Sequence, residues 1–232
     1  MKSPLTSVAL FHLGPVPITQ GVVATWVIML VMVGGGSLFT LRLTLVPSGV
    51  QAAFEVIVDM VDGQIRDTMQ LEPAPYRAFI GTLMLFIFVA NWSSLIPGVE
   101  PPTAHIETDA ALALLVFLAV IWFGIRAGGV SGYLKTFASP NPIMIPLNLI
   151  ESVTRTFSML VRLFGNVMSG VFVIGIVMSL AGLLVPIPLM ALDLLTGAVQ
   201  AYIFAVLAMV FIASAVNDDK PAPETSSPRT SP

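Results

Sequence analysis

Long apolar runs occupy most of the chain, and their lengths predict its organisation. A helix needs about 20 mainly apolar residues to cross a hydrocarbon core of about 30 Å. Runs near or above this length occupy residues 21–45, 79–96, 110–125, 143–185 and 187–216. The third is a little short for an untilted crossing, and the last two are longer than one perpendicular crossing needs. The run 143–185 fits either one strongly tilted helix or two helices joined by a bend.

Residues 48–70 follow a different pattern and predict a helix at the membrane surface. Four acidic residues alternate there with valine, isoleucine and methionine: Glu55, Asp59, Asp62 and Asp67. Such interleaving is typical of an interfacial amphipathic helix. Pro73 and Pro75 then interrupt the chain before the next crossing.

Together these patterns predict the fold class and the domain organisation. We expect an all-α polytopic membrane protein with about five transmembrane crossings, an interfacial amphipathic helix and a long tilted C-terminal helical hairpin. Residues 1–216 form a single membrane domain. Residues 217–232, NDDKPAPETSSPRTSP, are rich in proline, serine and charge and predict a disordered cytoplasmic tail.

Composition and charge narrow the class of partner. The 232 residues are 56% hydrophobic and 10% charged, against about 25% charged in soluble domains, so the lipid bilayer is the expected environment. The net charge of −3 and the lack of a basic patch argue against nucleic acid. The chain has no cysteine and its two histidines are far apart, so we expect no metal site. Its glycine-rich stretches lack the ending of a phosphate-binding loop, and no cofactor is expected.

The distribution of lysine and arginine predicts the orientation. Cytoplasmic loops carry an excess of these residues. They occur in the connection from Arg42 to Arg77, in the connection with Arg126 and Lys135, and in the tail, but not in the two intervening loops. Five crossings with the N-terminus outside and the C-terminus in the cytoplasm agree with this alternation.

Arg162 is a charged residue inside the fourth apolar run. No other charged side chain occurs between Arg155 and Asp193. An arginine at the centre of a bilayer costs about 2.5–3.5 kcal/mol on insertion scales and cannot lose its charge. The helix end nearest to it, toward Arg155, is about two turns away, farther than a snorkelling side chain reaches. We therefore interpret Arg162 as a functional residue.

Helical spacing places polar residues along one face of each of the last two helices. Arg162 precedes Asn166 by four residues and follows Arg155 by seven, and Asp193 precedes Gln200 by seven. Residues at these spacings share a helix face. We expect the two polar faces to meet, with glycine and serine residues allowing close approach.

Simpler interpretations exist for individual residues, and other classes of protein carry an intramembrane arginine. Asn166 can join helices, Asp193 can face water at the membrane surface, and Gln200 can bond a backbone carbonyl. A secondary transporter would bind an anionic substrate at Arg162, but no inverted repeat or pair of broken helices is evident. An assembly scaffold would leave the two polar faces unexplained.

Several motifs resemble subunit a of the F-type ATP synthase. RLFGN at 162–166 is followed by SG at 169–170 and by QAYIF at 200–204. The resemblance also includes EVIVDMVDGQIRD at 55–67, NWSSLIPGVEPPTAHIET at 91–108 and NPIMIPLNLIES at 141–152. It extends over residues 50–214 in family order.

This resemblance implies an ion-translocating stator of a bacterial inner membrane, not itself catalytic for ATP chemistry. Its expected partners are the c-subunit ring, the peripheral-stalk b subunits and the rest of the ATP synthase complex. Two aqueous half-channels lead the coupling ion to and from the ring, where an arginine drives ion release from ring carboxylates. The positions that match family residues on the ion pathway are Arg162 as the essential arginine, Gln200 as its partner, Asn166, Arg155, Glu151 and Asp193.

One departure bears on the subtype and on the ion. The family commonly has glutamate or histidine directly after the small pair that is Ser169–Gly170 here, and this chain has Val171. Either Asp193 serves in place of the missing glutamate or histidine, or neutral groups and water line the half-channel. The departure is typical of the divergent N-type, so the coupling ion is H⁺ or Na⁺.

Overall fold

The computed structural model describes residues 9–13, 16–41, 49–95, 101–138, 144–182 and 185–217. Its elements in chain order are β1 (Ala9–Leu13), β2 (Val16–Thr19), α1 (Gln20–Thr40), α2 (Gly49–Met69), α3 (Ala74–Trp92), η1 (Ser93–Leu95), η2 (Pro102–Ala104), α4 (Ile106–Ala138), α5 (Met144–Ala181) and α6 (Pro186–Asn217). Five helices, α1 and α3 to α6, are long and apolar enough to cross a membrane. The predicted all-α polytopic fold is confirmed. A short antiparallel hairpin of β1 and β2, which the hydropathy pattern did not indicate, precedes α1.

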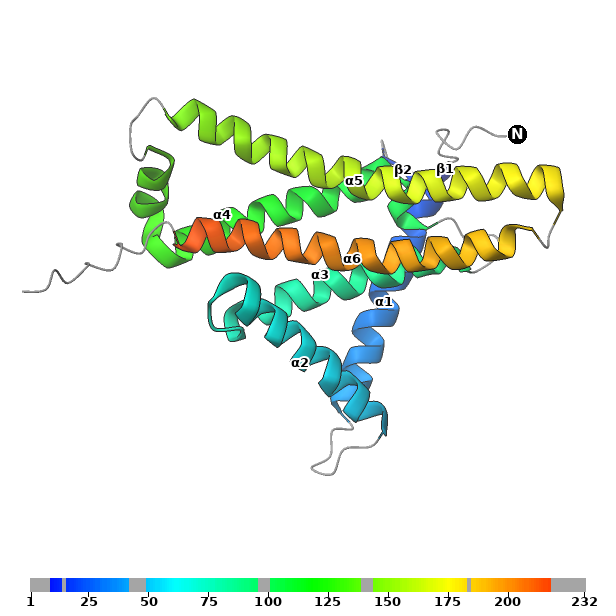
Figure 1. Ribbon diagram of the computed structural model, residues 1–232, viewed down its shortest axis with the longest axis horizontal. Coiled ribbons are helices and arrows are strands. Elements are labelled where there is room, and N and C mark those ends of the chain that lie inside the picture. Colours follow the sequence, from blue (N-terminus) through cyan, green and yellow to red (C-terminus); the bar gives the residue numbers. More distant parts are fainter. Residues whose placement is uncertain are drawn as a thin grey trace, which may run out of the picture.

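Helices α3 to α6 pack side by side along the long axis of the molecule, whereas α1 leads away from them and α2 returns toward α3 (Figure 1). The most central of these helices is α6: 56% of its apolar span is buried within the protein, against 11% for α5. Phe204, Ala205 and Ile212 of α6 pack into one core with Ile80 and Ile87 of α3. The small alanines of α6 permit this close approach.

Helix α5 is continuous from Met144 to Ala181, which decides between the two interpretations of the fourth run. Its 38 residues extend about 57 Å, well beyond a hydrocarbon core of about 30 Å. It runs antiparallel to α6 (Figure 1), and the two form the predicted long hairpin. Most of the α5 surface is exposed and apolar, including Phe157, Phe172 and Leu180.

Helix α4 differs from its predicted extent. The expected crossing at 110–125 was too short, because the helix begins at Ile106 and its apolar span continues to Val130. The polarity of Glu107 and Asp109 suggested a loop before the helix. They lie instead in the first turn of α4, where acidic residues are favourable because the helix dipole is positive there. Gly129 has a φ of 72° and kinks the helix, a backbone conformation that glycine adopts readily.

Helix α2 is amphipathic, as predicted, and packs on α3 and α6. Its buried face carries Val61, Ile65 and Met69. Asp62, on the same side, forms an ion pair with Arg77 of α3. The Tyr202 hydroxyl of α6 donates to Gln64 Oε1 at 3.0 Å. The predicted tail lies outside the described residues, except that α6 extends through Asn217.

Candidate functional site

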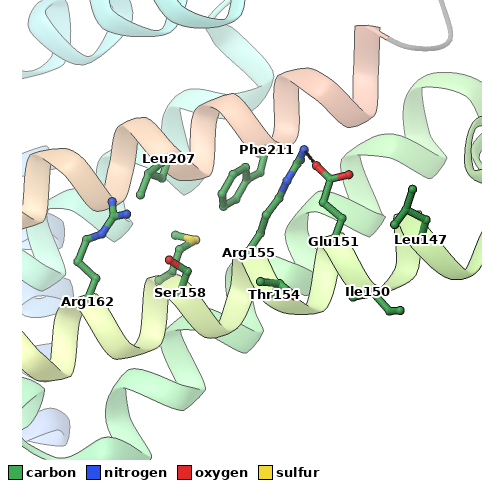
Figure 2. Close-up of a pocket in the computed structure, with 10 residues that line it drawn as sticks. Leu147, Ile150, Glu151, Thr154, Arg155, Ser158, Arg162, Leu207 and Phe211 are labelled. Atoms are coloured by element: carbon green, nitrogen blue, oxygen red, sulfur yellow. Dashed lines mark hydrogen bonds and ion pairs between the residues drawn. The ribbon is translucent and has the colours of Figure 1, made fainter.

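A hollow of about 520 Å³ lies between α5 and α6 and contains Arg162; it is named the Arg162 groove below. Figure 2 shows that the Arg162 side chain projects from α5 toward α6 near Leu207. The lining residues are Leu147, Ile150, Glu151, Thr154, Arg155, Ser158, Met159, Arg162, Leu207 and Phe211. The groove therefore leads from the N-terminal end of α5 to the arginine.

Charged partners are distributed unevenly along this groove. Arg155 forms an ion pair with Glu151 one turn away, and its guanidinium lies 5.3 Å from the centroid of the Phe211 ring. Both members of the ion pair are more than one third exposed, so it contributes only about 0.3–0.5 kcal/mol. The Arg162 side chain, by contrast, makes no hydrogen bond or ion pair with any described residue. Within the described part of the chain, the Arg162 guanidinium therefore has no anionic partner.

A second cavity, of about 200 Å³, contains Asp193 and is named the Asp193 cavity below. Its lining residues are Ser94, Leu95, Pro101, Val171, Ile174, Gly175, Met190, Asp193 and Leu194. Asp193 lies directly against Gly170 of α5, where any Cβ would overlap the carboxylate. The absence of a side chain at Gly170 therefore makes room for the acidic group. Val171, the departure from the family pattern, lines the same cavity.

Gln200 lies between these two hollows. On α6 it is midway between Asp193, which meets Gly170, and Leu207, which lines the Arg162 groove. Because α5 and α6 are antiparallel, Gln200 is level with the part of α5 between Gly170 and Arg162. It is 6% exposed, and its Nε2 has no hydrogen-bond partner among the described residues.

The predicted site residues thus fall into three places. Arg162, Arg155 and Glu151 share the Arg162 groove, Asp193 lines the other cavity, and Gln200 is buried between them. Asn166 is half-buried on α5 and lines neither hollow. The described residues contain no group of three or more His, Asp or Glu side chains able to hold a metal ion.

Sequence reasoning did not identify a polar cluster next to the Asp193 cavity. Asn91 donates from Nδ2 to the Gly197 carbonyl at 2.9 Å and accepts from the Thr103 hydroxyl at 2.7 Å. Trp92 donates from Nε1 to the Leu194 carbonyl at 3.2 Å. These bonds join the end of α3, η2 and α6 within one to two helical turns of Asp193. The pair Asn91–Trp92, two hydrogen-bonding side chains at the end of an apolar run, is the sequence feature that could have indicated this cluster.

Asp109 is a second residue that the sequence analysis missed. It is fully buried in the first turn of α4. Its helical spacing could have revealed it, because Asp109 precedes Leu112, Ala113 and Val116 by three, four and seven residues and so shares their helix face. These three residues form the buried face of α4. An acidic residue on an apolar helix face inside a membrane indicates function by default.

Fold and site together define a multi-pass membrane protein in which an arginine lies in one of two hollows along a long helix pair. The family model described as ATP synthase A chain matches residues 22–213. An "ATP synthase subunit a 2" from Bradyrhizobium sp. is 57% identical over 215 residues, which cover 93% of this chain and 96% of that protein. An "ATP synthase subunit a" from Albidiferax ferrireducens is 46% identical over 205 residues, covering 88% and 89%. The chain belongs to the ATP synthase A chain family, the membrane subunit a of the ATP synthase, and the predicted resemblance is confirmed.

Proposed function

We propose that the Arg162 groove and the Asp193 cavity belong to two separate half-channels through which the coupling ion enters and leaves a rotating c-subunit ring. The observation that supports this most directly is the pair of hollows along α5 and α6, one toward each end, with Arg162 at the inner end of the first. Two pathways that each stop partway force an ion to travel on the ring from one to the other. Ion flow is thereby coupled to rotation.

Arg162 is the fixed positive charge that drives ion release from the ring carboxylates. At about 4 Å and an effective dielectric constant near 20, its attraction for a ring carboxylate is roughly 4 kcal/mol, which favours the ionised carboxylate and ion release. A guanidinium stays charged, so it also blocks direct passage of cations between the half-channels. Its lack of a partner among the described residues, together with the exposed apolar surface of α5, supports a ring on this face.

The remaining site residues serve the two half-channels. Glu151 and Arg155 line the Arg162 groove, and Asp193 draws cations into the other cavity or relays protons there. Gln200 and Asn166 are polar groups along α6 and α5 between the two pathways. Peripheral-stalk b subunits hold the chain stationary against the ring.

Charge distribution supports the orientation. Arg66 lies in the last turn of α2, Arg77 in the first turn of α3, Arg126 in the second half of α4 and Arg155 in the first half of α5. In Figure 1, α3 and α5 begin and α4 ends at the same end of the α3–α6 bundle. This end is cytoplasmic in a bacterial inner membrane by the positive-inside rule. The Asp193 cavity then opens toward the periplasm, and the C-terminus is cytoplasmic. The coupling ion is H⁺ or, in the divergent N-type, Na⁺.

Replacement of Arg162 tests the proposal. Arg162→Ala should abolish ATP-driven ion uptake into inverted membrane vesicles while the complex still assembles, and Arg162→Lys should not restore it, because lysine loses its proton in a dry site and lacks the planar fork. Arg126→Ala, which removes an exposed arginine from α4, is the matched control and should transport normally. Near-normal coupled transport by Arg162→Ala would refute the mechanism. Purification as a lone monomer that binds an organic anion would favour the transporter instead.

A further inference from the structure

Asp109 is a buried carboxylate that the proposed half-channels do not include. It is 0% exposed, and neither of its carboxylate oxygens has a hydrogen-bond partner among the described residues. Its backbone N–H donates to the His105 carbonyl at 3.3 Å, which fixes it within the first turn of α4. Because Leu112 and Val116 continue the same buried face, its carboxyl group lies in the interior of the bundle and not at the lipid surface.

The surroundings of Asp109 provide little to hold a permanent negative charge. The N-terminal dipole of α4 offers a partial positive charge. On the elements packed around this end, the described titratable side chains are His105 at the start of α4, Glu107 on its exposed side and Asp193 on α6. The nearby ends of α1, α3 and α5 carry none. An unpaired ionised carboxylate is costly in such a place, so the buried form of Asp109 is the neutral, protonated acid.

Polar groups connect this end of α4 to the Asp193 cavity. Pro101 lines that cavity, and the η2 turn that follows it contacts α1, α3, α4 and α5. From η2, the buried Thr103 hydroxyl bonds to Asn91, which bonds to the Gly197 carbonyl one turn from Asp193. Hydrogen-bonding groups therefore extend from η2, which contacts α4, to the part of α6 that carries Asp193.

We propose that Asp109 is a proton-exchanging residue of the outer half-channel, acting between the periplasmic water and Asp193. The Asp109 carboxylate accepts a proton from a hydronium ion on its outer side, which leaves a water molecule, and is neutral while buried. It then passes that proton through water to the Asp193 carboxylate, which becomes neutral as Asp109 returns to the carboxylate, so the summed charge of the two groups does not change in this transfer. This inference rests on the proposed function and adds a second carboxylate to a pathway in which Val171 contributes no titratable group.

Asp109→Asn is the direct test, because asparagine keeps the size of the side chain but cannot exchange a proton. We expect passive proton flux through vesicles stripped of the catalytic sector to fall at least tenfold, with normal amounts of assembled complex. Asp109→Glu, which retains the exchangeable proton, should keep at least half of the flux and shift its pH profile. Glu107→Gln, an equal change of charge two residues away on the exposed side, should stay within twofold of the parent.

A second measurement does not depend on the asparagine variant assembling. The chain has no cysteine, so Asp109→Cys introduces a unique thiol whose access to a small cation can be measured with Ag⁺. Because a thiol keeps an exchangeable proton, we expect Asp109→Cys to retain measurable flux and Ag⁺ added on the periplasmic side to block it, but not to block flux in the parent or in Val116→Cys, two turns deeper on the same face. Insensitivity of an assembled Asp109→Cys complex to Ag⁺ would overturn the proposal.

Different results would contradict the half-channel mechanism and the role of Asp109. If Arg162→Ala abolishes coupled transport while assembled Asp109→Asn transports within twofold of the parent, the role of Asp109 is wrong and the half-channel mechanism stands. If Arg162→Ala itself transports normally, the mechanism fails first and the role of Asp109 fails with it.

Discussion

The contact between Gly170 and Asp193 predicts that alanine at position 170 will displace the carboxylate from the Asp193 cavity. A Cβ on Gly170 would overlap Asp193 Oδ1 and would lie 2.8 Å from Cγ. Carbon atoms in van der Waals contact are about 3.5–4.0 Å apart. The carboxyl group of Asp193 therefore has to move away by about 1 Å.

Gly170→Ala should change ion flux much more than it changes the stability of the protein. Alanine is favoured over glycine within a helix by about 0.8–1.0 kcal/mol, which offsets the roughly 0.5–1.5 kcal/mol of an off-rotamer Asp193 side chain. The free energy of unfolding should thus change by less than about 1 kcal/mol. A misplacement of about 1 Å at a reacting group can reduce a rate about 100-fold, so we expect flux to fall by roughly ten- to a hundredfold.

The assay measures ATP-driven and passive ion flux in vesicles, together with the amount and the thermal stability of the assembled complex. Gly81→Ala is a suitable control, because its Cβ would make only an ordinary contact at 3.9 Å with Val61. If Gly170→Ala acts through Asp193, it should reduce flux little further in an Asp193→Asn background, which is itself expected to be slow. Normal flux in Gly170→Ala, or an equal loss in both backgrounds, would refute the reasoning.

Two further predictions concern the same cavity and the attachment of α2. Val171→Glu should restore part of the flux of Asp193→Asn, because Val171 lines the Asp193 cavity and a glutamate there returns a carboxylate to it; no gain in vesicle flux over Asp193→Asn alone would contradict this. Arg77→Leu should lower the thermal stability of the purified complex, because it leaves the 6% exposed Asp62 without its guanidinium. Thermal unfolding of the complex measures this loss. Adding Asp62→Leu to the same chain should partly reverse it. An unchanged unfolding transition in Arg77→Leu would count against a stabilising role of the ion pair.

The sequence by itself determined the membrane-spanning segments, the amphipathic helix and the unusual arginine. Each of these depends on properties that are local along the chain: the length of an apolar run, the period of its polar residues, and the cost of one charge among apolar neighbours. The start of α4 was predicted too late, because Glu107 and Asp109 look like loop residues in a hydropathy pattern. A helix N-terminus accepts them, and burial of Asp109 depends on neighbours far away in the chain.

Only the tertiary structure decided which polar residues meet. The spacing of Asp193 and Gln200 gives their common face on α6, but it does not give the axial position of α6 against α5. That position is set by packing between the helices, where Asp193 fits only against the bare backbone of Gly170. The bonds from Asn91 to α6 and the burial of Asp109 likewise depend on how separate helices pack. A helical pattern defines a face, whereas the partner of that face is chosen by the combined packing of the whole bundle.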